Sequence, residues 1–197
     1  MKTLTKALFL AALTFYAAIP ARLQAQIIDD RLIEGLLDLT EPSQPQELRL
    51  GAISELGRQR FFGRQNVYER LMDLTQAVES QPVRLAAIGA VGRPEAGIWP
   101  GTQDRLIDLL DPREEEPIRV AAIYALTASQ AMAFPRPRGT LADLAADKRE
   151  SLAVRVAALT CLRSSSAFQN EPRRDLFNDL CGDETEDPAV RRAACGF

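Results

Sequence analysis

Histidine is absent from the 197-residue sequence. Its absence excludes Ser-His-Asp and Cys-His nucleophile activation, histidine metal ligands, and the usual proton shuttle near neutral pH. Carboxylates or lysine can support other chemistry, but no carboxylate pair or nucleophile stands apart from positions that recur along the chain. We therefore predict that the protein is not an enzyme and has no catalytic residues, no metal and no cofactor.

Long apolar runs are also missing, and the longest stretch is short. It extends from Ala7 to Ile19, follows Lys2 and Lys6, and precedes a small residue, Ala25. A bilayer-spanning helix needs about 20 apolar residues. A basic start, a short apolar run and a small-residue exit are typical of a secretory signal peptide.

We therefore predict a signal peptide at residues 1–25 and a mature chain at residues 26–197. The mature chain is expected to be periplasmic or extracellular, with no stable membrane anchor after cleavage. The alternatives for the apolar run are a first core helix and an uncleaved anchor.

The charge is acidic, and cleavage would make it more so. Residues 1–25 contain three basic residues and no acid, so their removal takes the formal charge from −3 to −6. An acidic chain binds the phosphate backbone poorly. We predict no nucleic-acid partner.

One arginine followed by small apolar residues recurs through the chain, as in "PVRLAAIGAV", "PIRVAAIYAL" and "AVRVAALTCL". A second marker, an aspartate in segments such as "LLDL", "LMDL" and "LIDL", recurs with the same period. The arginines are spaced by 35, 35, 36 and 36 residues and the aspartates by 35, 35, 35 and 36. Two independent markers that keep one period indicate a repeat array. The arginines are Arg49, Arg84, Arg119, Arg155 and Arg191, and the aspartates are Asp38, Asp73, Asp108, Asp143 and Asp179.

Each repeat is expected to contain two helices. Apolar residues three and four apart predict the first helix, and proline opens the second at Pro82, Pro117 and Pro188, where its missing N–H has no cost. The alanines after the arginine allow close packing against neighbouring helices. We predict an all-α fold, a right-handed α-solenoid of about five two-helix repeats. Their approximate bounds are 27–62, 63–97, 98–134, 135–170 and 171–197.

The segments "QPVRLAAIGAV", "EPIRVAAIYAL" and "DPAVRRAACGF" resemble the second helix of HEAT repeats. The resemblance is to the bacterial HEAT-like type shared with phycobilisome lyases, and it covers about residues 27–197. It implies a fold but no single activity, because that family includes scaffolds, inhibitors, lyase subunits and DNA glycosylases.

Each aspartate lies at the end of one predicted helix and each arginine at the start of the next, where the helix dipole disfavours the charge of both. We expect them to compensate each other across the short turn, as Asp38 with Arg49 and so on through the five repeats. The alternative is that the arginines line a groove for a ligand.

Three cysteines lie in the last two repeats of a chain that we expect to enter an oxidising compartment. Cys161 and Cys195 occupy nearly the same height on successive second helices, so a disulfide between them is our prediction. The alternative is that the cysteines are buried thiols.

The loops between repeats are rich in arginine and aromatic residues, whereas the turns within repeats are acidic. Arginine and aromatic side chains are enriched at the energetic centres of protein interfaces. We predict a partner-binding edge there, and the alternative is that the aromatics fold back to cover the helices. The candidate residues are Phe61, Phe62, Trp99, Phe134, Arg136 and Arg138.

The function expected from these features is an exported, non-catalytic scaffold that binds a protein or peptide. An enzyme subunit resembling the HEAT-like bilin lyases is the alternative, and a HEAT-like nucleic-acid enzyme is a third possibility. Export opposes both alternatives, and the acidic charge also opposes the third.

Overall fold

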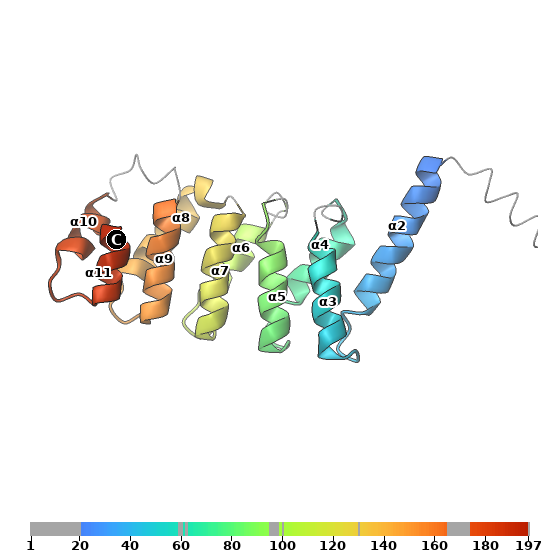
Figure 1. Ribbon diagram of the computed structural model, residues 1–197, viewed down its shortest axis with the longest axis horizontal. Coiled ribbons are helices and arrows are strands. Elements are labelled where there is room, and N and C mark those ends of the chain that lie inside the picture. The colour runs from blue at the N-terminus through green and yellow to red at the C-terminus, as the bar shows by residue number, and fades with distance from the viewer. Residues whose placement is uncertain are drawn as a thin grey trace, which may run out of the picture.

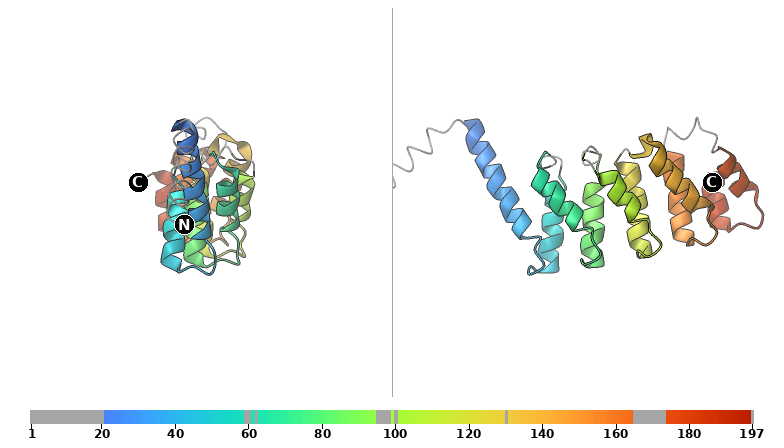
Figure 2. Two further views of the ribbon diagram at one scale, coloured as in Figure 1. Left: turned by 90° about the vertical axis from the view of Figure 1, so that its right-hand side faces the viewer. Right: turned by 180° about the vertical axis from the view of Figure 1, so that it is seen from behind.

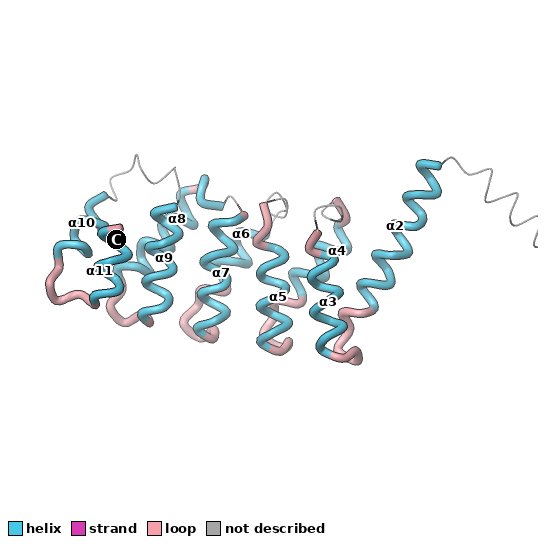
Figure 3. The backbone as a smooth tube through the Cα atoms, in the orientation of Figure 1, coloured by secondary structure: helices cyan, strands magenta, loops and turns pink. Residues whose placement is uncertain are grey.

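The computed structural model describes the backbone of residues 21–58, 61, 63–94, 99, 101–129, 131–164 and 174–196, and the side chains of these residues except 21–28 and 174. Within these ranges every regular element is a helix, as Figure 3 shows. The predicted all-α class is confirmed. None of the described helices is long and apolar enough to cross a membrane.

The helices follow one another as antiparallel pairs along an elongated molecule (Figure 1). In each pair the first helix packs on the second, and the second helices pack side by side in sequence order. The pairs are α2 (Ala21–Asp38) with α3 (Gln46–Leu56), α4 (Gln65–Asp73) with α5 (Gln81–Val91), α6 (Thr102–Asp108) with α7 (Glu116–Ala128), α8 (Pro135–Ala146) with α9 (Leu152–Ser164), and α10 (Arg174–Gly182) with α11 (Pro188–Cys195). A short 3-10 helix, η3 (Ala131–Ala133), precedes α8.

Two layers are visible when the molecule is viewed along its length (Figure 2). One layer contains α3, α5, α7 and α9, and the other contains α4, α6 and α8. The turns inside the pairs lie along one edge, the lower edge of Figure 1, and the second helices end at the opposite edge. The predicted acidic turns and the predicted partner-binding loops therefore belong to opposite edges.

The core forms where the two layers meet. Aliphatic side chains four residues after the arginines, Ile53, Ile88, Ile123 and Leu159, are fully buried. The second helices also approach one another closely at their C-terminal ends. A Cβ atom added to Gly92 would lie 2.5 Å from the Cβ of Ala125, and one added to Gly57 would lie 2.9 Å from the Cβ of Ala90. Only glycine leaves room for this contact.

Residues 1–20 of the predicted signal peptide lie outside the described residues. Residues 21–25 form the start of α2, which continues to Asp38 without a break.

Candidate functional site

The periodic arginines are enclosed by the helices. Arg49, Arg84, Arg119 and Arg155 are between 4 and 7% exposed. Each Nε donates a hydrogen bond to a backbone carbonyl at the end of the first helix of its own pair. The acceptors are the carbonyls of Thr40 (2.9 Å), Thr75 (2.9 Å), Leu110 (2.9 Å) and Ala145 (3.0 Å).

The terminal nitrogens of the same arginines bind a glutamate of the following helix pair. The contacts are Arg49–Glu79 (2.7 Å), Arg84–Glu114 (2.6 Å), Arg119–Glu150 (2.7 Å) and Arg155–Glu186 (2.7 Å). We call these four contacts the arginine–glutamate ladder. Each arginine therefore joins its own pair to the next one.

The ladder corrects the predicted aspartate–arginine pairs. Asp38, Asp73, Asp108, Asp143 and Asp179 are all exposed. None of them forms a salt bridge among those described, because the buried guanidinium reaches a carbonyl on one side and the next pair's glutamate on the other. The positive charge of each ladder arginine is compensated, as expected, but by a backbone carbonyl and a glutamate of the next pair and not by the predicted aspartate. The four ladder arginines are structural residues and not a ligand-binding surface.

The sequence contains a signal for the missed glutamates. Glu79, Glu114, Glu150 and Glu186 each stand five residues before a periodic arginine, within the acidic turns. The first turn has Gln44 at this position. The fixed offset was visible, but it did not show that the glutamate pairs with the arginine of the preceding repeat.

The ladder changes the ionisation of its best-enclosed pair. Arg155 binds both carboxylate oxygens of Glu186, at 2.8 and 2.7 Å. These hydrogen bonds lower the pKa of Glu186 to about 2 and raise the pKa of Arg155. Glu186 therefore stays charged through the whole range in which ordinary glutamates become protonated.

The predicted partner-binding edge is partly structural. Phe61 is buried in the core. The ring of Trp99 stacks on that of Tyr68 with centroids 5.1 Å apart, and the hydroxyls of Tyr68 and Thr102 are hydrogen-bonded at 3.0 Å. Phe62 lies outside the described residues. For Phe61 and Trp99 the structure favours the alternative, in which aromatics cover the helices.

The arginines of this edge also divide into two kinds. Arg138 is buried and donates to the carbonyls of Met132 (3.1 Å) and Ala133 (3.3 Å), so it holds η3 against α8. Arg136 is exposed and forms an ion pair with the exposed Asp104. Phe134, which precedes α8, has 52% of its surface exposed. Among the predicted residues of this edge that the structure describes, Phe134 and Arg136 are therefore the ones accessible to a partner.

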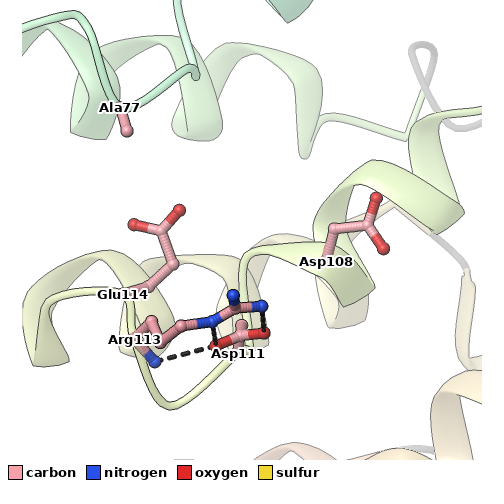
Figure 4. A pocket seen from close by; sticks show the side chains of 5 residues that line it. All are labelled: Ala77, Asp108, Asp111, Arg113 and Glu114. Carbon is pink, nitrogen blue, oxygen red and sulfur yellow. Dashed lines mark hydrogen bonds and ion pairs between the residues drawn. The ribbon is translucent and has the colours of Figure 1, made fainter.

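A shallow cleft of about 460 Å³ lies at the opposite, acidic edge, lined by Ala77, Asp108, Asp111, Arg113 and Glu114. Figure 4 shows Arg113 folded back on Asp111, with Nε 2.9 Å from Oδ1 and a terminal nitrogen 2.7 Å from Oδ2. These bonds hold the pKa of Asp111 well below its usual range. Glu114 binds Arg84 of the ladder, so within the cleft itself the printed ion pair is that of Arg113 with Asp111.

The cysteines pair differently from the prediction. A disulfide joins Cys181 to Cys195, with Cα atoms 5.1 Å apart, and Cys161 is free and buried. The predicted Cys161–Cys195 bond is wrong because Cys195 faces its own partner helix, α10, where the separation suits a disulfide. Burial raises the pKa of the Cys161 thiol, so this side chain behaves as a small apolar core residue. No group of three or more potential metal ligands occurs in the described part of the chain.

No protein-family model matches the sequence, and a search of curated proteins found no match.

Proposed function

We propose that this chain is an exported, non-catalytic scaffold that binds a protein or peptide partner. Its architecture in this proposal is a right-handed α-solenoid of about five HEAT-like repeats in the mature chain. The observation that supports it is the arginine–glutamate ladder, which joins each helix pair to the next with one period. Stacked pairs of this kind expose long continuous edges, and such edges serve as binding surfaces.

The proposed contact is the edge at which α8 begins. Phe134 and the adjacent Arg136 combine an exposed ring with an exposed guanidinium. Exposed rings beside arginine are typical centres of protein interfaces. Buried Phe61, Trp99 stacked on Tyr68, and buried Arg138 give this edge a rigid support.

The proposal is tested by affinity capture from an envelope extract with residues 26–197 as bait. The bait Phe134→Ser/Arg136→Glu should lose the captured partner while keeping its helicity. The matched control is Arg113→Glu on the acidic edge, whose side chain is 90% exposed, and this bait should keep the partner. Equal capture by all three baits would contradict the assignment of the edge.

Export is tested independently by N-terminal sequencing of the protein from its producing cells. The mature chain should begin near Gln26 and occur outside the cytoplasm. An intact Met1 in a soluble cytoplasmic pool would contradict export.

A further inference from the structure

The solvent side of the second helices can be compared between repeats, because each repeat places equivalent residues there. In α7 the buried side carries Ile118, Ala122 and Ile123. The other side carries Val120, which is partly exposed, and Tyr124, which is exposed. At the exposed positions of this side the other repeats carry no large apolar residue. Five residues after the periodic arginine stand Ser54, Gly89, Thr160 and Gly196, and three residues before it stand Gln46, Gln81, Glu116 and Pro188.

Two neighbouring repeats depart from this pattern. Tyr124 of α7 and Leu152 of α9 occupy these two positions and are 50 and 46% exposed. The two helices pack side by side (Figure 1). Between Tyr124 and Leu152 in height lie the partly buried Val120 and Val156, each one residue after its periodic arginine. We call these four residues the α7–α9 strip.

The stacking of the repeats does not explain the strip. The other second helices pack on their neighbours with small or polar residues at the same positions. The ring of Tyr124 and the side chain of Leu152 therefore expose apolar surface that the fold does not require. Neighbouring exposed apolar residues of this kind mark sites of contact with another molecule.

The strip suits a helix better than an extended peptide. It is formed by side chains of two helices whose own backbone groups are bonded within each helix, so it has no backbone donors or acceptors for an occupant. An extended segment would bury unsatisfied N–H and C=O groups there, whereas a helix satisfies its own. Leu152 stands three residues before its periodic arginine and Tyr124 five residues after its own. This difference in register corresponds to about 12 Å along the helix axis, or about two turns of an occupant helix.

One end of the strip is acidic. Glu116 occupies on α7 the position that Leu152 occupies on α9, and it is exposed, with Glu115 beside it. Glu116 forms no salt bridge among those described. At the other end, Arg163 of α9 donates to the Ala193 carbonyl of α11 at 2.9 Å. A basic residue on an occupant is therefore complementary to the Glu116 end of the strip.

We propose that the α7–α9 strip docks an amphipathic helix of a partner protein. The helix carries apolar residues four positions apart and a lysine or arginine that meets Glu116. The acidic end of the strip disfavours an anionic lipid surface, because carboxylates repel its headgroups.

This inference goes beyond the proposed function, since it assigns a second surface and the chemistry of its partner. The strip lies on the layer of second helices, whereas Phe134 and Arg136 stand at the start of α8 in the other layer.

The test uses two fluorescein-labelled, alanine-based helical peptides as probes. Both carry leucines spaced by four residues, and one position beside the first leucine is lysine in one peptide and glutamate in the other. In fluorescence anisotropy the purified protein should bind the lysine peptide more tightly than the glutamate peptide. Glu116→Lys should reverse this preference. Tyr124→Ser/Leu152→Ser should weaken binding of the lysine peptide by about tenfold or more, because the occupant loses its apolar contacts.

Two variants serve as controls. Val78→Ser removes an apolar side chain that is 87% exposed on the acidic edge, and it should bind the lysine peptide as the wild type does. Phe134→Ser/Arg136→Glu should also bind it unchanged, so a failure of the proposed edge and a failure of the strip give different results.

Each contrary result overturns the proposal. These are a wild-type chain that does not bind the lysine peptide, equal binding by Tyr124→Ser/Leu152→Ser, and a charge preference that Glu116→Lys does not reverse. Self-association of the wild type in sedimentation velocity that Tyr124→Ser/Leu152→Ser abolishes would make a second copy the occupant. Binding to phosphatidylglycerol vesicles that the same variant abolishes would make a lipid surface the occupant.

Discussion

At the scale of single residues, the ladder arginines are held by two different helix pairs at once. The Nε of Arg119 donates to the Leu110 carbonyl of its own pair, and its terminal nitrogens bind Glu150 of the next pair. A buried ion pair adds little net stability compared with apolar side chains, but removal of one partner leaves the other uncompensated. The ladder therefore makes the protein sensitive to loss of either member of a contact.

Arg119→Gln should lower the free energy of unfolding by about 3 kcal/mol, because the buried Leu110 carbonyl loses its side-chain donor and Glu150 its ion-pair partner. Urea unfolding followed by circular dichroism measures the change. Arg113→Gln is the control, since that side chain is 90% exposed and its loss should leave the urea midpoint unchanged. A loss below about 0.5 kcal/mol for Arg119→Gln would place this contact among ordinary surface pairs.

Glu186 should make stability depend on pH in acid. Arg155 lowers the folded-state pKa of Glu186 to about 2, below its ordinary value of 4.5. A depressed folded-state pKa stabilises the protein above the unfolded-state value, and this contribution is lost as the pH falls from about 5 to about 2. The difference in urea midpoint between the wild type and Glu186→Gln should therefore be constant from pH 6 to pH 7 and shrink towards pH 2. A difference independent of pH would show that Glu186 has the same pKa in the folded and the unfolded chain.

At the scale of elements, glycine allows neighbouring second helices to approach each other closely. The C-terminal end of α5 passes so close to α7 that a Cβ at Gly92 would lie 2.8 Å from the Cα of Ala125. Gly89, three residues earlier and exposed, has nothing within 4 Å of the position that a Cβ would occupy.

Alanine should therefore have opposite effects at these two glycines of one helix. Gly92→Ala should destabilise by about 1–3 kcal/mol, because the helices must move apart. Gly89→Ala should stabilise by about 0.5–1 kcal/mol through its better helix propensity. Urea denaturation of both variants measures the two signs, and stabilisation by both would show that α5 and α7 are not closely packed at this point.

The disulfide should act locally on the last helix pair. It closes a loop with a sequence separation of 14, for which constraint of the unfolded chain contributes about 3 kcal/mol. Reduction should speed amide hydrogen exchange in residues 174–196 while leaving α5 unchanged. A Cys181→Ser/Cys195→Ser variant should exchange equally fast with and without reductant. Detection of three free thiols in the unreduced protein would contradict the bond.

The difference between prediction and structure is clearest at this scale. Helix pairs and their period followed from the sequence because apolar spacing and the arginine marker depend only on neighbours along the chain. The partner of each arginine and that of Cys195 depend on which helix faces which. Asp143, the predicted partner of Arg155, and Glu186 are both acidic in the sequence, and only the packing of α11 against α9 brings Glu186 to Arg155. Likewise, Phe61 and Phe134 are the same residue type in similar loops of the sequence, but in the structure Phe61 is buried and Phe134 is exposed.

At the scale of the whole molecule, each second helix packs on the first helix of its own pair and on its neighbours in the row. Deletion of residues 102–136, one period, should therefore leave a shorter protein that unfolds cooperatively at a lower midpoint. In that variant Arg84 should pair with Glu150. A double-mutant cycle of Arg84→Gln and Glu150→Gln should give a coupling of about 1 kcal/mol or more there, and none in the full-length chain. Loss of all cooperative unfolding would show that the core is not modular.

The ladder also explains what specifies the order of the helix pairs. Its four contacts are chemically alike, so the glutamate of one turn fits the arginine of any pair that meets it. The correct neighbour is therefore chosen by covalent connection and not by recognition. When concentrated chains refold together, a helix pair of one molecule can take the place of its counterpart in another without losing any native contact. Domain swapping is the consequence of this chemical uniformity, and slow refolding at low concentration is the condition that favours the monomer.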